Sequence, residues 1–134
     1  GRAEVVGFSV SATLDEGCAV AAEPLDFGAI PVGFTAAVHQ STSVSVTCTD
    51  QTAYSIGLGE GQNFDASAGM RSMASGASRL HYQLLTDEGQ DWVGRTDTGT
   101  GTIQTFPVYG AVPAGQTGLT AGSYTDSVVV TVDY

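Results

Sequence analysis

The chain has 134 residues and a mass of 13.6 kDa, the size of one domain with a single hydrophobic core. Charged residues make up 13% of it and hydrophobic residues 42%, which excludes a solvated, disordered chain. Four arginines, no lysine and 14 acidic residues give a net charge of −10, which disfavours nucleic acid and anionic lipid as partners. The absence of lysine also excludes a Walker phosphate loop and a Schiff-base enzyme.

Apolar and polar residues alternate along nearly the whole chain, which predicts β-strands, and no convincing helical period occurs. In residues 6–14 the even positions are apolar, and Gly, Ser and Thr lie between them, which predicts a half-buried strand. Those even positions are Val6, Phe8, Val10, Ala12 and Leu14. Further strands are predicted over residues 18–22, 42–48 and 53–58.

The middle of the chain has a weaker pattern. Residues 59–78 are rich in Gly, Ser and Ala, and they predict a long loop with one irregular strand, anchored to the core by Met70 and Met73. Strand character resumes over residues 80–85. The glycines, threonines and aspartates of residues 94–101 predict a turn.

Two strands are predicted in the last part of the chain. The first covers residues 103–109 and contains Pro107, which indicates a sheet edge or a bulge. The second covers residues 124–134, where Asp126 interrupts an apolar face. That face consists of Tyr124, Val128, Val130, Val132 and Tyr134. Seven or so strands without an internal repeat or a linker predict one all-β domain, a β-sandwich.

The two cysteines, Cys18 and Cys48, fit no zinc pattern, because neither has a second Cys or His at ligand spacing. They are either two buried thiols of a cytosolic protein or one disulfide of an exported protein. Both lie at ends of strand-like segments in an acidic chain rich in Thr, Ser and Gly. This setting favours the disulfide.

The candidate catalytic residues do not form a recognisable motif. His39 lies in a predicted polar loop and His81 in a predicted strand, and no Gly-x-Ser-x-Gly elbow accompanies them. Asp87 and Asp91 could flank a glycosidic bond, or bind Ca²⁺ together with Glu88. The EF-hand spacing is absent, so a solvated acidic turn is the favoured interpretation.

Trp92, Tyr82 and Tyr109 could form a platform that stacks on sugars. Aromatic residues of a sandwich are more often part of the core or caps at strand ends, which is the interpretation that we favour. The sequence thus predicts no catalytic site, no cofactor and no metal site.

Several short stretches along nearly the whole chain carry a resemblance to one family. They are FSVSATL at 8–14, LDFG at 25–28, VSVTCT at 44–49, VYG at 108–110, PAGQ at 113–116 and AGSYTDSVVVTVDY at 121–134. In this order they resemble the spore coat protein U domain, which is shared by the pilins of archaic chaperone–usher pili such as the Csu type. Ala111 and Leu85 depart from the family pattern, in which Arg and an aromatic residue are common at those places.

The resemblance implies an incomplete immunoglobulin-like sandwich that lacks its last strand, here residues 15–134. It also implies that residues 1–14 are a donor strand, whose apolar even positions plug the groove of a neighbouring subunit. A periplasmic chaperone would fill that groove first, and assembly would proceed at an outer-membrane usher. Such β-augmentation, repeated head to tail, makes a filament.

We therefore expect no enzyme, but a structural major pilin of an archaic chaperone–usher fimbria. It would be exported through the periplasm to the cell surface, where its fibres would serve adhesion and biofilm formation. Two alternatives are a secreted module that binds carbohydrate or a surface, such as a tip adhesin, and a self-contained spore or cell coat protein. A two-domain adhesin would need a further N-terminal domain, for which we expect no room in 134 residues.

Overall fold

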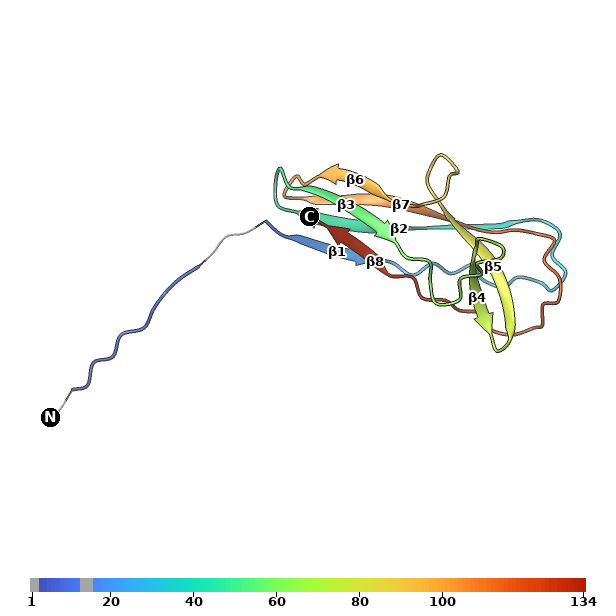
Figure 1. The fold of residues 1–134 in the computed structure, drawn as a ribbon, viewed down its shortest axis with the longest axis horizontal. Coiled ribbons are helices and arrows are strands. Elements are labelled where there is room, and N and C mark those ends of the chain that lie inside the picture. Colours follow the sequence, from blue (N-terminus) through green and yellow to red (C-terminus); the bar gives the residue numbers. More distant parts are fainter. Residues whose placement is uncertain (1–2, 13–15) are drawn as a thin grey trace.

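The structure is a computed structural model, and it describes residues 3–12 and 16–134. The described residues form two antiparallel sheets that pack face to face (Figure 1). One sheet has five strands in the order β1-β2-β7-β5-β4, and the other has three in the order β6-β3-β8. The strands are β1 (Cys18–Ala22), β2 (Val38–Cys48), β3 (Ala53–Leu58), β4 (Arg71–Ser75), β5 (Ser78–Leu85), β6 (Arg95–Thr98), β7 (Ile103–Val112) and β8 (Val130–Asp133).

The core lies between the sheets because alternate residues of each strand point inward. β2 and β7 pair along ten positions at the centre of the larger sheet. The inward side chains are buried in residues 44–48 of β2 and in residues 106–112 of β7, whereas Ser and Thr occupy most of the outward positions of β2. The buried inward residues of these two strands include Val44, Val46, Cys48, Phe106 and Val108.

The aromatic residues are divided between the core and the surface. Trp92 is 1% exposed, and its indole N–H donates to the carbonyl of Pro107 at 3.2 Å. Tyr82 is buried as well, whereas Tyr109 lies on the outward side of β7. The interpretation of Trp92 and Tyr82 as core residues is therefore confirmed, and the three rings do not share one platform.

The strands predicted over residues 18–22 and 53–58 are confirmed as β1 and β3. β2 begins earlier than predicted, so His39 lies in a strand and not in a polar loop. The reason is that β7 continues to Val112, which pairs with Val38 and extends the ladder. Main-chain pairing does not require apolar side chains, so the sequence pattern does not mark this extension.

Two segments without strand patterns contain strands. The turn predicted over residues 94–101 is wrong, because β6 lies there and pairs with β3 at a sheet edge. All four residues of β6 are exposed, which explains why no apolar alternation marks it. Within residues 59–78, β4 is a regular strand paired with β5. Met73 packs against the core from β4.

Pro107 lies in a central strand but at a local edge. β5 pairs with β7 only through Gln83–Leu85, beyond which the two strands separate. At Pro107, β7 therefore has β2 on one side, while its carbonyl accepts the Trp92 hydrogen bond described above. The missing N–H of the proline costs no ladder hydrogen bond there.

The long strand predicted over residues 124–134 forms a ladder only in β8. The predicted orientation of its side chains is correct nonetheless, because half-buried and exposed residues alternate from Tyr124 to Asp133. Tyr134 does not belong to the buried face, since it is 64% exposed. The chain is extended over this whole segment but changes its neighbours along the way.

Residues 3–12 extend away from the sandwich (Figure 1). The predicted half-buried strand is not formed within this chain, and Val6, Phe8 and Val10 are 90%, 87% and 85% exposed. Ala12 is exposed too, and Leu14 lies outside the described residues. Alternation predicts a strand, but a strand requires an edge to pair with, and this segment contacts none in the single chain.

Cys18 and Cys48 form a disulfide, which confirms that prediction. The two residues lie directly opposite each other in the β1–β2 ladder. The bond therefore ties the start of β1, an edge strand, to the central part of the larger sheet.

Replacing both cysteines by alanine should lower the free energy of unfolding by about 3–4 kcal/mol, because the unfolded chain loses a cross-link across a sequence separation of 30. Trp92 is the only tryptophan and is buried, so its fluorescence during denaturant unfolding reports this change. An unchanged unfolding midpoint would contradict the prediction.

Candidate functional site

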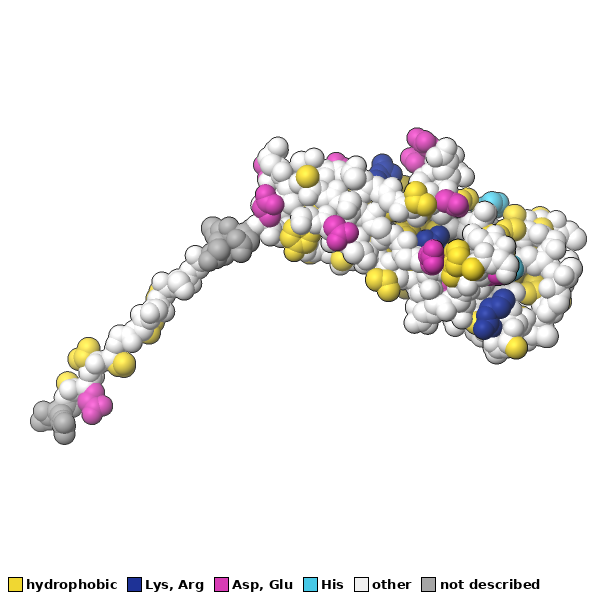
Figure 2. Space-filling view, in the orientation of Figure 1, with side chains coloured by type: hydrophobic (Ala, Val, Ile, Leu, Met, Phe, Trp, Pro, Cys, Tyr) yellow, Lys and Arg dark blue, Asp and Glu magenta, His cyan; other side chains and the backbone are white. Residues whose placement is uncertain are grey.

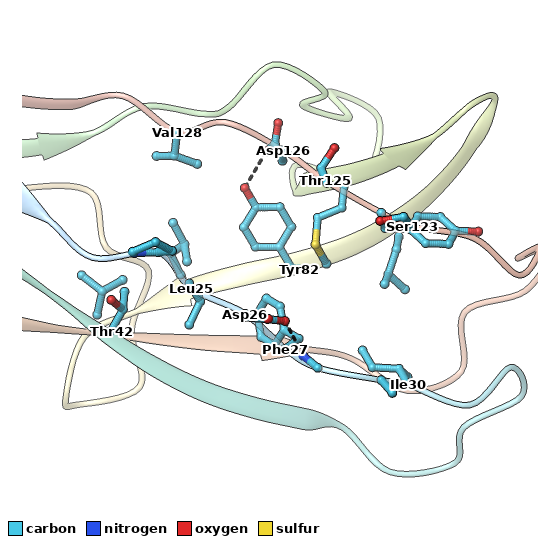
Figure 3. A pocket seen from close by; sticks show the side chains of 18 of the residues that line it. Leu25, Asp26, Phe27, Ile30, Thr42, Tyr82, Ser123, Thr125, Asp126 and Val128 are labelled. Atoms are coloured by element: carbon cyan, nitrogen blue, oxygen red, sulfur yellow. Dashed lines mark hydrogen bonds between the residues drawn. The ribbon is translucent and has the colours of Figure 1, made fainter.

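A groove with a volume of about 970 Å³ opens between the two sheets. Residues 22–34, which follow β1, line one side of it, and residues 119–130, which lead into β8, line the other (Figure 3). Core side chains form its floor. They include Val44, Met73, Leu80, Tyr82, Leu84 and Val108.

The wall that follows β1 is held by side chains. Leu25 and Phe27 lie over Gly110 of β7, where an added Cβ would be 2.6 Å from Leu25 and 2.7 Å from Phe27. Only glycine leaves room for this close approach. Phe27 also packs at an angle against Tyr82, with ring centroids 6.3 Å apart. The side chains of Leu25 and Phe27 thus extend the apolar surface of the floor onto this wall.

The opposite wall continues into β8, and residues 124–132 form an extended chain with one free edge. Thr125 exchanges hydrogen bonds with Ala74 of β4, and the carbonyl of Val129 accepts one from Gly59 at 2.8 Å. Main-chain groups point to opposite sides at successive residues of an extended chain. Since these odd residues bond toward β4 and β3, the even residues direct their N–H and C=O groups toward the groove.

β1 has a matching free edge. The main chains of Gly17 and Glu23 bond toward β2, so the even residues between them present their polar groups on the other side. Val20 faces inward, opposite Val46, yet it is 45% exposed while Val46 is fully buried. An inward apolar side chain is uncovered here because none of the strands in residues 3–12 and 16–134 lies between β1 and β8. The sandwich lacks one strand.

A polar cluster lies within the groove. The hydroxyl of Tyr82 donates to Asp126 Oδ2 at 2.5 Å (Figure 3). Asp126 Oδ1 accepts from the main-chain N–H of Gln62 at 2.9 Å and from Asn63 Nδ2 at 3.2 Å. Gly61 approaches the carboxylate so closely that a Cβ there would overlap it.

This environment shifts the ionisation of Tyr82. Burial, the hydrogen bond to Asp126 and the negative charge of Asp126, in that order, raise the pKa of the Tyr82 phenol well above its ordinary value. The sequence marks Asp126 only as an interruption of an apolar face. An acidic residue at an inward position is nevertheless the signal that could have predicted a buried partner.

The raised pKa of Tyr82 predicts a loss of stability at high pH. The unfolded chain releases the tyrosine proton near its ordinary pKa of about 10, before the folded chain does, so the free energy of unfolding falls above about pH 10. Tyr82→Phe should reduce this loss, as measured by denaturant unfolding at about pH 8 and about pH 11. Tyr109→Phe, at an exposed tyrosine, is the matched control. An equal loss in both variants would refute the assignment.

The other candidate residues lie apart from the groove. His39 is exposed on β2. His81 on β5 donates from its ring to Asp65 at 2.9 Å, which lowers the pKa of Asp65, and its main chain bonds to the side chain of Gln116. These contacts tie two loops to β5.

Asp87, Glu88 and Asp91 are exposed at the turn that follows β5. Within residues 3–12 and 16–134, no three His, Cys, Asp or Glu side chains are placed to hold a metal ion. The same residues include no helix long and apolar enough to span a membrane.

The fold is similar to a solved structure. A chain in the crystal structure of the chaperone–tip adhesion subunit pre-assembly complex from archaic chaperone-usher Csu pili of Acinetobacter baumannii superposes with a TM-score of 0.67 at 22% identity. The match covers 91% of this chain and 40% of that chain. Together with the free edges, it defines the fold as an immunoglobulin-like sandwich that lacks a strand.

The family is identified from the sequence. The family model of the Spore Coat Protein U domain matches residues 5–131, so this chain belongs to that family. The predicted resemblance is confirmed. No curated protein matches the sequence.

Proposed function

We propose that this chain is a subunit of an archaic chaperone–usher fimbria, polymerised by donor-strand exchange. Residues 1–14 of one copy are the donor strand, and residues 15–134 of the next copy are the acceptor domain. One observation carries the proposal: the same chain has an apolar groove with two free edges and an exposed, extended segment with matching alternation. β-augmentation requires this pair of features.

The donor side chains supply the binding energy. Burying a Val, Leu or Phe side chain contributes roughly 1.5–3 kcal/mol, and four of the five plugs are of this size. The inserted strand would also pair with the edges of β1 and β8. The plugs are Val6, Phe8, Val10, Ala12 and Leu14. A joint of several such plugs would dissociate very slowly.

The proposal implies helpers for the unassembled subunit. An exposed apolar groove flanked by free strand edges is an aggregation hazard. A periplasmic chaperone that occupies the groove, and an outer-membrane usher where the neighbouring strand replaces it, would remove the hazard. The contact is heterologous, so it repeats into an open filament on the cell surface.

The donor segment favours the role of the structural major pilin over that of a tip adhesin. A subunit at the distal end of a fibre receives a strand in its groove from the subunit behind it. It has no subunit ahead of it, so it needs no donor strand of its own. Residues 3–12 have the exposure and alternation of a strand that is donated. A fibre of such subunits would serve adhesion and biofilm formation.

Val10→Arg should abolish polymerisation, because the guanidinium would be buried without a partner in the groove of the next subunit. The variant should still bind its chaperone, since its own groove is unchanged. Ser9→Arg is the matched control, because its side chain would point to solvent after insertion. Electron microscopy of fibres from cells that express each variant measures the outcome. The donor-strand proposal is wrong if the two variants polymerise equally well.

The acidic turn should have no part in assembly. Asp87→Asn combined with Asp91→Asn should leave both fibre yield and thermal stability unchanged, with and without a Ca²⁺ chelator. The reason is that these side chains lie outside the groove and are exposed. A loss of fibres, or a melting temperature that depends on Ca²⁺ only in the unmodified chain, would instead require a structural metal site at this turn.

A further inference from the structure

The wall formed by residues 124–132 has one polar inward position. Its half-buried even residues are Tyr124, Asp126, Val128, Val130 and Val132. Asp126 alone among them is charged, and it lies where the ring of Tyr82 rises from the floor (Figure 3). The inward side of this wall therefore carries a charged residue at this one position.

We call the place along the groove that each inward wall residue occupies a level. The Asp126 level should reject a large apolar side chain. Both carboxylate oxygens already have donors, from Tyr82, Gln62 and Asn63, but the side chain remains partly exposed to water. A Leu or Phe plug would remove the remaining water without offering a hydrogen bond, which is unfavourable. A Leu or Phe plug would also compete for space with the Tyr82 ring, whereas the methyl group of an alanine would not.

The donor segment has one small inward position. Its even residues span eight residue steps from 6 to 14, the same number as from 124 to 132 in the wall, about 27 Å in each case. Ala12 is the fourth plug from the N-terminal end, and Asp126 is the fourth even wall position from the C-terminal end. When all five wall positions are filled, the small plug and the charged position coincide only if the two strands run in opposite directions.

We propose that Asp126, positioned by Tyr82, fixes the register of the inserted strand by accepting Ala12 of a second copy. This inference rests on the proposed function. It adds, for each inward residue of the donor strand, the wall residue that it lies beside. The strand lies antiparallel to the wall with the pairs Val6–Val132, Phe8–Val130, Val10–Val128, Ala12–Asp126 and Leu14–Tyr124.

Other registers place a large plug on the carboxylate. Sliding the antiparallel strand by two residues brings Val10 or Leu14 to Asp126. A parallel strand that fills all five levels brings Phe8 there. A parallel strand shifted to place Ala12 at Asp126 leaves the levels of Val130 and Val132 without plugs. One register alone fills every level and spares the carboxylate.

The test uses labelled peptides of residues 3–16 and the full-length Val10→Arg chain, which keeps its groove but cannot donate. Fluorescence anisotropy measures binding. The Ala12→Leu peptide should bind at least about tenfold more weakly than the unmodified peptide, a difference of about 1.4 kcal/mol. The Val10→Leu peptide adds bulk at an apolar level and is the matched control; it should bind within about threefold of the unmodified peptide.

Asp126→Ala in the acceptor should reverse the preference, so that the Ala12→Leu peptide binds more tightly than the unmodified one. Equal binding of the Ala12→Leu and unmodified peptides to the intact groove would overturn the register while leaving donor-strand exchange in place. Equal weakening of binding by Ala12→Leu and Val10→Leu would likewise overturn the register while leaving donor-strand exchange in place. No binding by the unmodified peptide would overturn the proposed function, and this inference with it.

Discussion

The two free strand edges, on β1 and β8, are the constraint on which the other features of this molecule depend. A strand edge presents unpaired N–H and C=O groups, and the inner face beside it presents apolar side chains. Because no strand in the described part of the chain lies between these edges, Val20 is exposed although it faces inward, and the groove reaches the floor of the core. Residues 3–12, the proposed donor segment, have the complementary deficit, because their apolar side chains are exposed and their main chain pairs with no strand among the described residues.

The sequence pattern predicts structure where one face of a strand is buried and the other is not. β1 and β3 were predicted with correct bounds for this reason. β6 was missed because its side chains are all exposed, so that only main-chain pairing with β3 specifies it. In residues 124–134 the pattern predicts which side chains point inward. It cannot predict that the segment bonds first to β4 and then to β3, because hydrogen-bond partners leave no mark on side-chain alternation.

The polar cluster at Asp126 was beyond sequence reasoning for a different reason. Its donors come from Gln62, Asn63 and Tyr82, which are 64, 63 and 44 residues away along the chain. Their convergence is a property of the sandwich and not of any local motif. The anomaly itself was visible, however, as a carboxylate among valines. An inward charge costs free energy unless it is paired, so it indicates a built environment before that environment is known.

Chain geometry supports the proposal that another copy fills the groove. β8 ends beside the start of β1 (Figure 1), and the two strands contact each other, so β1, which begins at Cys18, starts at the end of the groove where β8 ends. In the register above, Leu14 lies at the level of Tyr124, about 27 Å further along the groove. Only four residue steps join Leu14 to Cys18, and fully extended they reach about 14 Å. A chain therefore cannot insert its own donor strand in this register. In the proposed assembly, the same short connection that prevents self-completion leaves the strand available to a neighbouring copy, and a contact that cannot close on itself continues as a fibre.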